Sequence, residues 1–203
     1  MILASHNSWA SKPKHWYMYP FLFMAKCQNK TIEQQWDCGV RMFDLRLFFD
    51  SKDRVSVRHG ILTFKTCYSG IMHDLSMLQQ KALKDSQTVY VRVMLEQNHK
   101  NKKQDALERN FSRFCALLKE CFPHILFFSG ARKFDNHQLY DLNTPEPKII
   151  HRYSSTTSLF GEDKRKWYAK IDDFWPWLYA HLHNKESLNK YANEDCYLML
   201  DFI

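Results

Sequence analysis

The sequence predicts an α/β fold, a TIM-type (β/α) barrel that is distorted or incomplete. Short apolar runs alternate along the chain with helical patterns, which is typical of a mostly parallel sheet covered by helices. Six or seven such runs fit into 203 residues, a number that suits a barrel without full closure. The chain carries no internal repeat, low-complexity segment or linker, so residues 1–203 are predicted to form a single domain.

The predicted strands are short runs rich in Val, Ile, Leu, Phe and Tyr. They are Ile2–Ser5, Arg41–Phe48, Val55–Val57, Val89–Leu95, Ile125–Phe128, Lys148–Arg152 and Tyr197–Phe202. Two helices are predicted between strands, because apolar residues recur there every three or four positions, as one helix face requires. The residues that mark them are Met72, Leu75 and Leu78 for the first, and Leu107, Phe111, Phe114, Leu118 and Cys121 for the second.

Glycine is scarce and dispersed, with five in 203 residues, where average usage of about 7% would give roughly fourteen. Phosphate-binding loops and nucleophile elbows need clustered glycines that let the backbone approach a ligand or turn sharply. The sequence therefore excludes these motifs. If this protein binds phosphate, its side chains must supply the contacts.

The chain is basic, with 29 Lys and Arg against 22 Asp and Glu and a net charge of +7. This charge predicts attraction to nucleic acid, an anionic membrane surface or a phosphorylated substrate. Six cysteines without a C-x-x-C pair are interpreted as buried free thiols. No signal peptide and no apolar run of membrane-spanning length is visible, so we expect a soluble protein, cytoplasmic or peripheral at a membrane.

Ionisable side chains gather at the ends of the predicted strands. They are His6, Asp44, Arg46, His59, Glu96, Arg152 and Asp201. In a barrel the carboxyl ends of the strands form the rim that carries the chemistry. Two histidines can divide the work of base and acid near neutral pH, and a guanidinium supplies positive charge to a phosphate. Taken singly, each histidine also fits a structural role, Asp44 and Arg46 fit a simple ion pair, and Asp201 fits a cap on a barrel layer.

Four sequence blocks together resemble the X domain of the phosphatidylinositol-specific phospholipase C family. They are Ser5-His6-Asn7-Ser8, Gly39-Val40-Arg41-Met42-Phe43-Asp44-Leu45-Arg46, Arg58-His59-Gly60 and Leu198-Met199-Leu200-Asp201-Phe202-Ile203. The order and spacing match across the chain, and the His-Gly pair thirteen residues after Arg46 is the most specific part. The resemblance implies a distorted TIM-type barrel that cleaves the phosphodiester between diacylglycerol and inositol phosphate.

The resemblance also implies a role for each matching residue. His6 is the general base that takes the proton of the inositol 2-hydroxyl, and Asp201 orients it. His59 is the general acid that protonates the departing glycerol oxygen. Arg46 stabilises the charge on the phosphate, and the product is a cyclic inositol phosphate. Arg152 corresponds to the inositol-binding arginine.

Residues near Arg46 bear on metal use. The calcium-dependent branch of the family is similar to this chain at His6-Asn7, Asp44 and Glu96, which include oxygen donors that suit Ca²⁺. Where that branch has a further acidic ligand, this chain has Arg46, as the metal-independent bacterial branch does. We therefore predict no metal and no cofactor, with Ca²⁺ as the alternative. Asp44 and Glu96 are expected to hold the guanidinium, with Glu96 also assigned to substrate binding.

Asn7 departs from the bacterial branch, which usually has Asp at this position. The neutral amide removes a charge that would raise the pKa of His59.

Aromatic residues interleaved with lysines lie between the first two predicted strands. They are Trp9, Trp16, Tyr17, Tyr19, Phe21 and Phe23, among Lys12, Lys14 and Lys26. This pattern suits contact with a membrane surface that carries the phospholipid substrate, and core packing under a loop is the alternative. We expect no nucleic-acid partner, and the sequence carries no signal for an oligomeric state.

Two other functions stay open. The first is a glycerophosphodiester phosphodiesterase-like or sphingomyelinase-D-like barrel, which needs a cluster of acidic metal ligands. The second is a catalytically silent barrel that binds lipid or nucleic acid through its charge and aromatic residues.

Overall fold

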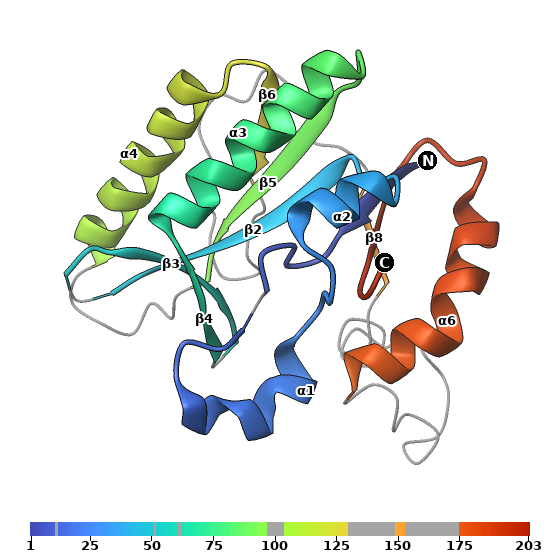
Figure 1. Cartoon of the computed structure of the whole chain (residues 1–203), viewed down its shortest axis with the longest axis horizontal. Helices are drawn as coiled ribbons and strands as arrows, with labels where there is room; N and C mark the ends of the chain where they lie inside the picture. The colour runs from blue at the N-terminus through green and yellow to red at the C-terminus, as the bar shows by residue number, and fades with distance from the viewer. Residues whose placement is uncertain (11, 51, 61, 97–103, 130–148, 153–174) are drawn as a thin grey trace.

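The computed structural model describes residues 1–10, 12–50, 52–60, 62–96, 104–129, 149–152 and 175–203 (Figure 1). The strands in these ranges are β1 (Ile2–Ser5), β2 (Met42–Phe49), β3 (Val55–His59), β4 (Leu62–Cys67), β5 (Val89–Leu95), β6 (Ile125–Ser129), β7 (Ile149–Arg152) and β8 (Tyr197–Leu200). The helices are η1 (Trp16–Phe21), α1 (Leu22–Ala25), α2 (Ile32–Asp37), α3 (Tyr68–Lys84), α4 (Gln104–Cys121) and α6 (Pro176–Tyr191).

Six strands pair in parallel, in the spatial order β7-β8-β1-β2-β5-β6. The sheet curls as half a barrel, and within the described ranges no pairing joins β6 to β7. The predicted α/β fold and the incomplete barrel are therefore confirmed. All seven predicted strands are present, and β1 and β5 have the predicted bounds. Lys148, the predicted start of β7, lies outside the described residues.

The β3–β4 hairpin corrects the predicted connectivity. Strand β4 was not predicted, and β3 is antiparallel to both β2 and β4. The sequence signal for β4 is weak, because only Leu62 and Phe64 of this strand have buried apolar side chains. His59 therefore does not end a parallel strand. It ends a strand that runs back along β2, which returns it toward Asp44 and Arg46.

The two faces of β2 have different neighbours. Because successive side chains of a strand point to opposite faces, every second residue faces the helices. Those residues are Phe43, Leu45, Leu47 and Phe49, all buried in the main apolar core. The same core holds Ile71, Leu75, Leu78 and Ala82 of α3, so both predicted helices are present and the first packs on the predicted face. Figure 1 shows α2, α3 and α4 on this side of the sheet.

The opposite face of the sheet begins with an apolar layer. Its buried members are Ala4, Met42, Phe128 and Met199. His6 follows Ala4 by two positions along the chain. In the same way, Asp44 follows Met42, and Asp201 follows Met199. The two-residue period of a strand brings these ionisable groups above the apolar layer, on the concave side of the sheet. This layering positions the site described below.

Two glycines adopt backbone conformations that the site requires. Helix α2 begins with a capping box between Thr31 and Gln34. It is followed by Gly39, whose φ of 92° turns the chain into β2. Gly60 has a φ of 56° directly after His59. Residues other than glycine rarely adopt such φ angles, so both turns depend on the missing Cβ of glycine.

The cysteines are all free thiols, as predicted, but most are not buried. Cys27 and Cys196 are buried, whereas Cys38, Cys67 and Cys121 are exposed and Cys115 is half-buried. The expectation of buried thiols is therefore wrong for four of the six. No helix in the described ranges combines the length and the hydropathy that a membrane crossing requires.

Candidate active site

His6 and Asp201 form a buried pair at the ends of two neighbouring strands. Ser5 at the end of β1 pairs with Leu200 at the end of β8, so the next residue of each strand lies at the same edge of the sheet. His6 Nδ1 lies 2.7 Å from Asp201 Oδ1. When a neutral His6 has its proton on Nδ1 and donates it to Asp201, its Nε2 atom carries the lone pair.

His59 faces His6 across the site. The centroids of the two imidazole rings are 5.1 Å apart, with an interplanar angle of 84°. His59 Nδ1 lies 3.1 Å from the carbonyl oxygen of Ala25. The next residue, Gly60, donates its backbone N–H to Glu96 Oε1 at 3.1 Å. His6 is fully buried and His59 is half-buried.

Arg46 is held by the two carboxylates that the sequence assigned to it. Its Nε atom lies 2.7 Å from Asp44 Oδ2, and its Nη1 atom lies 3.5 Å from Glu96 Oε2. Asp44 and Arg46 are two residues apart on β2 and share one face, as the strand period predicts. Both carboxylates are buried, so the guanidinium is fixed in direction as well as in charge.

Asp44 connects the guanidinium to the loop after β1. Asn7, which has a φ of 42°, donates its backbone N–H to Asp44 Oδ2 at 3.1 Å. Arg92 Nη1 lies 3.7 Å from Asp44 Oδ1. Burial acts to raise the pKa of Asp44, but the charges of Arg46 and Arg92 and these hydrogen bonds hold it below its usual range. The carboxylate is therefore ionised at neutral pH.

The pKa of His59 is lowered to about 4. Burial of the imidazole is the largest cause and the charge of Arg46 is the second, while Glu96, Asp44 and the Ala25 carbonyl act in the opposite direction. His59 is therefore neutral at pH 7 in the free protein. Asn7 supplies no negative charge that would oppose this shift, in line with the departure noted in the sequence.

Two buried acids near His6, namely Asp201 and the Cys27 thiol, both have raised pKa values. Burial raises the pKa of Asp201 well above its usual range, opposed by a hydrogen bond from Cys27 and by the charge of Arg46. Burial and the charge of Asp201 raise the pKa of the Cys27 thiol. Asp201 therefore gains strongly from any positive charge that develops on the neighbouring imidazole.

Two buried glutamines, which the sequence reasoning missed, hold these loops in place. The Gln28 amide donates to the carbonyl oxygens of His6 at 3.2 Å and Leu200 at 3.0 Å. The Gln35 amide donates to the carbonyl oxygen of Ser8 at 2.9 Å. No local sequence signal marks either glutamine, because their burial depends on which loops the fold brings around them.

Arg92 and Cys27 were also missed. Arg92 carried a usable signal, since it is the one charged residue within β5 and lies opposite Asp44 in the parallel pairing of β2 with β5. Cys27 carried none. It follows α1 in the chain, and only the fold brings its Sγ atom to 3.8 Å from His59 Nδ1.

The backbone position of Arg152 is described, but its side chain is outside what the structure describes. Arg152 ends β7 and pairs with Leu200, directly before Asp201. Its contact with inositol stays a prediction. Glu96, also assigned to substrate binding, contacts Arg46 and the backbone of Gly60, and its contact with substrate likewise stays a prediction.

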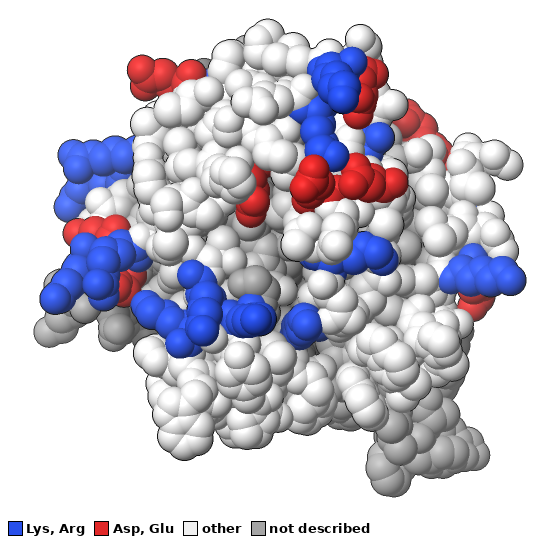
Figure 2. Space-filling model, viewed as in Figure 1, with Lys and Arg blue, Asp and Glu red and all other residues white. Residues whose placement is uncertain are grey.

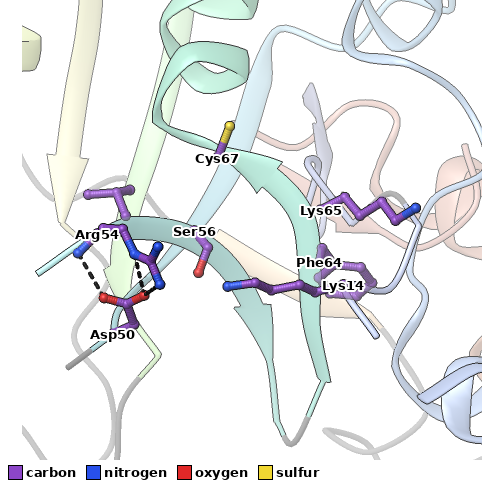
Figure 3. A pocket seen from close by; sticks show the side chains of 8 residues that line it. Lys14, Asp50, Arg54, Ser56, Phe64, Lys65 and Cys67 are labelled. Carbon is purple, nitrogen blue, oxygen red and sulfur yellow. Dashed lines mark hydrogen bonds and ion pairs between the residues drawn. The ribbon is translucent and has the colours of Figure 1, made fainter. Parts of the chain in front are cut away.

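A separate small pocket lies along the β3–β4 hairpin (Figure 3). Its volume is about 170 Å³, and it is lined by Lys14, Asp50, Arg54, Val55, Ser56, Phe64, Lys65 and Cys67. Its acidic side chain, Asp50, is already paired with Arg54 at 2.7 Å. None of the histidines or carboxylates of the site lines this pocket, so it takes no part in the chemistry considered below.

The comparisons with known proteins identify the fold. No protein-family model matches the sequence, and no curated protein matches it. Phosphatidylinositol-specific phospholipase C from Listeria monocytogenes superposes with a TM-score of 0.62 and 18% identity, covering 99% of this chain and 87% of that one. A double mutant of the Staphylococcus aureus enzyme gives a TM-score of 0.60 and 18% identity, covering 99% and 84%.

A second structure of the Staphylococcus aureus enzyme, solved in work on its membrane binding, gives a TM-score of 0.60 and 17% identity over 99% of this chain and 85% of that one. The fold is therefore that of the bacterial phosphatidylinositol-specific phospholipases C, as the sequence resemblance implied.

The shifted pKa of His59 predicts how stability depends on pH. The unfolded chain takes up a proton at His59 near pH 6.5, whereas the folded chain does so only near pH 4. We therefore expect the free energy of unfolding to fall as the pH drops from 6.5 to 4. Urea unfolding at a series of pH values measures this dependence.

The variant that isolates this effect is His59→Asn, which is expected to have a shallower pH dependence than the wild type. His124→Asn, at an exposed position, is the control and should keep the wild-type slope. Equal slopes for His59→Asn and the wild type would contradict the low pKa.

Proposed function

We propose that this protein is a phosphodiesterase that cleaves phosphatidylinositol, or a related phosphodiester, into diacylglycerol and a cyclic inositol phosphate. The observation that carries the proposal is the arrangement of His6 and His59, whose rings face each other 5.1 Å apart in the fold of the bacterial phospholipases C. Arg46 lies beside His59 and supplies the positive charge that a phosphodiester needs.

In the first step His6 acts as the general base. Its Nε2 atom takes the proton of the inositol 2-hydroxyl, and the oxygen attacks phosphorus. The imidazolium that forms is stabilised by Asp201, which holds Nδ1 at 2.7 Å. Because Asp201 is buried, its interaction with this new charge is stronger than it would be in water.

Breaking the bond to glycerol needs an acid, and His59 is the residue we assign to it. The charge of Arg46 helps to keep His59 neutral in the free protein. A bound phosphate diester offsets that charge, so the pKa of His59 rises when substrate is present. The protonated His59 then gives its proton to the glycerol oxygen as the phosphorus–oxygen bond breaks. Its partly exposed position suits a leaving group that departs toward a lipid surface.

We propose that this reaction needs no calcium ion and no cofactor. Asp44 and Glu96, the carboxylates that would ligate calcium here, both bind Arg46. The guanidinium therefore takes the oxygen ligands that a calcium ion would need here. It stabilises the charge on the non-bridging phosphate oxygens, a role for which single donors contribute about 10²–10³ in rate.

The binding of Asp44 and Glu96 to Arg46 also weakens the glycerophosphodiester phosphodiesterase alternative, which needs acidic metal ligands. In the described part of the chain, the one group of three or more side chains able to hold a metal is His6, Cys27 and His59, which contains no carboxylate.

We further propose that the protein meets its lipid substrate at a membrane surface. Most of the aromatic residues between β1 and β2 are exposed, namely Trp16, Tyr17, Tyr19, Phe21 and Phe23. Trp9 and Trp36 are the exceptions, since both pack in the core. Figure 2 shows a band of Lys and Arg side chains across this face of the molecule, above an uncharged area where Figure 1 has α1. Exposed rings beside basic groups favour an anionic lipid interface.

The direct test of the proposed function is incubation with phosphatidylinositol vesicles in excess EDTA. We expect phosphorus NMR to detect a cyclic inositol phosphate in the aqueous phase. His6→Asn and His59→Asn should each lower the rate at least about 100-fold, since each removes a proton-transfer group. Tyr68→Phe, a conservative change at an exposed position, is the control.

Two results would contradict the proposal. Absence of cyclic phosphate with the wild type would refute the substrate and favour a silent lipid-binding barrel. Turnover that appears only when calcium replaces EDTA would refute the role of Arg46.

The membrane contact predicts a second result. Replacing both Trp16 and Phe23 by Ala should weaken binding to vesicles that contain anionic lipid by at least about tenfold, because buried aromatic rings each contribute on the order of 1–3 kcal/mol. Co-sedimentation with vesicles measures the change. Leu83→Ala, which removes an exposed apolar side chain on α3, should bind as the wild type does. Equal losses in both variants would argue against a specific lipid-binding surface.

A further inference from the structure

We propose that His6, Cys27 and His59 form a binding site for a thiophilic divalent cation such as Zn²⁺, and that the bound ion blocks the two histidines. Each residue offers one ligand atom, and the three atoms lie within 4.8 Å of one another. Imidazole nitrogen and thiolate sulfur are the donors that Zn²⁺ prefers, and three protein ligands leave one position open.

The separations suit tetrahedral coordination after a small movement. Bonds of about 2.1 Å to nitrogen and about 2.3 Å to sulfur place neighbouring ligand atoms about 3.6 Å apart. Cys27 Sγ and His59 Nδ1 are 3.8 Å apart, and for Nδ1 to bind the metal it must give up its 3.1 Å contact with the carbonyl oxygen of Ala25. The most distant donor atoms, at most 4.8 Å apart, need to approach by about 1.2 Å.

The atom that His6 offers is Nε2, because Nδ1 is bound to Asp201. A carboxylate behind a metal-binding imidazole is the outer-shell arrangement that fixes the ring and raises its basicity as a ligand. The pair that prepares His6 to accept a proton therefore also prepares it to bind a metal.

Cys27 is held in position by backbone bonds on the far side of the site. Phe202, the residue after Asp201, donates its backbone N–H to the carbonyl oxygen of Cys27 at 2.7 Å. Gln28, the residue after Cys27, binds the carbonyl oxygens of His6 and Leu200. The thiol and the His6–Asp201 pair are therefore parts of one rigid unit, so binding does not require a loop to become ordered.

The donor set also selects the metal. Calcium and magnesium prefer oxygen ligands, and none of these three residues supplies one. The metal takes the Cys27 sulfur as thiolate, so binding releases the thiol proton.

The inhibitory part of this proposal rests on the proposed function, whereas metal binding does not. A Zn²⁺ ion that takes the lone pairs of both histidines leaves neither able to transfer a proton. Cys27 has no part in the proposed reaction. It adds a third metal ligand to the two histidines, which are the proton-transfer residues.

Calorimetric titration with Zn²⁺ and the absorption spectrum with Co²⁺ test the site without any substrate. We expect one tight Zn²⁺ per chain and a thiolate-to-cobalt charge-transfer band. Cys27→Ser should lose the band and bind Zn²⁺ at least about tenfold more weakly, since loss of an outer-shell partner alone costs about 10–100-fold. Cys196→Ser, at the other buried cysteine, is the matched control and should keep both.

A second variant guards against misfolding of Cys27→Ser. His59→Asn keeps the thiol and is also expected to bind Zn²⁺ at least about tenfold more weakly. Unchanged Zn²⁺ affinity in both variants, or a cobalt band that survives Cys27→Ser, would overturn the site.

Activity assays separate the two proposals. If the protein hydrolyses phosphatidylinositol, Zn²⁺ should lower the wild-type rate, and the ratio of rates with and without Zn²⁺ should be closer to one in Cys27→Ser. Equal ratios would overturn the inhibition. If no hydrolysis is found but one Zn²⁺ binds through Cys27, the proposed function fails and the metal site stands.

Discussion

The rest of the site depends on the buried ion pair between Asp44 and Arg46. A charge removed from water costs several kcal/mol unless a partner compensates it. Asp44 supplies the compensation at 2.7 Å and Glu96 adds a second carboxylate at 3.5 Å, so a guanidinium is stable inside the half-barrel. Asp44 is itself held by the backbone N–H of Asn7, which ties the pair to the loop that carries His6.

In the proposed function, this fixed positive charge links phosphate binding to proton transfer. In the free protein it acts with burial to hold His59 neutral, because a second positive charge nearby is unfavourable. A phosphate that binds to Arg46 reverses this effect. In the proposed reaction, His59 acquires its proton when a phosphodiester binds, whereas in the free site it is neutral. His6 and His59, with Cys27 beside them, are the donor set proposed above for a transition metal.

Side-chain periodicity explains how much of this the sequence could predict. The alternation along β2 places Asp44 and Arg46 on one face, and the positions of His6 and Asp201 after two strands place them at one rim. Periodicity does not say which strands are neighbours or in which direction they run. The antiparallel β3–β4 hairpin was therefore missed, although His59 reaches the site through it.

Cys27 and Gln28 show a second limit. Both lie in a connection without a regular pattern, and they approach His6 and Asp201 only because the two ends of the chain meet in adjacent parallel strands. The aromatic segment between β1 and β2 shows a third limit, since its composition fitted both a core and a membrane-facing surface. The fold buries Trp9 and leaves Trp16 83% exposed.

The most direct measurement of the central claim is an NMR titration of His59, in the free protein and with saturating inositol 1-phosphate. We expect a pKa of about 4 for His59 without ligand. With ligand, we expect the pKa of His59 to be higher by at least about one unit, because the phosphate offsets the charge of Arg46. The same low pKa in both states would contradict the coupling of Arg46, phosphate and His59.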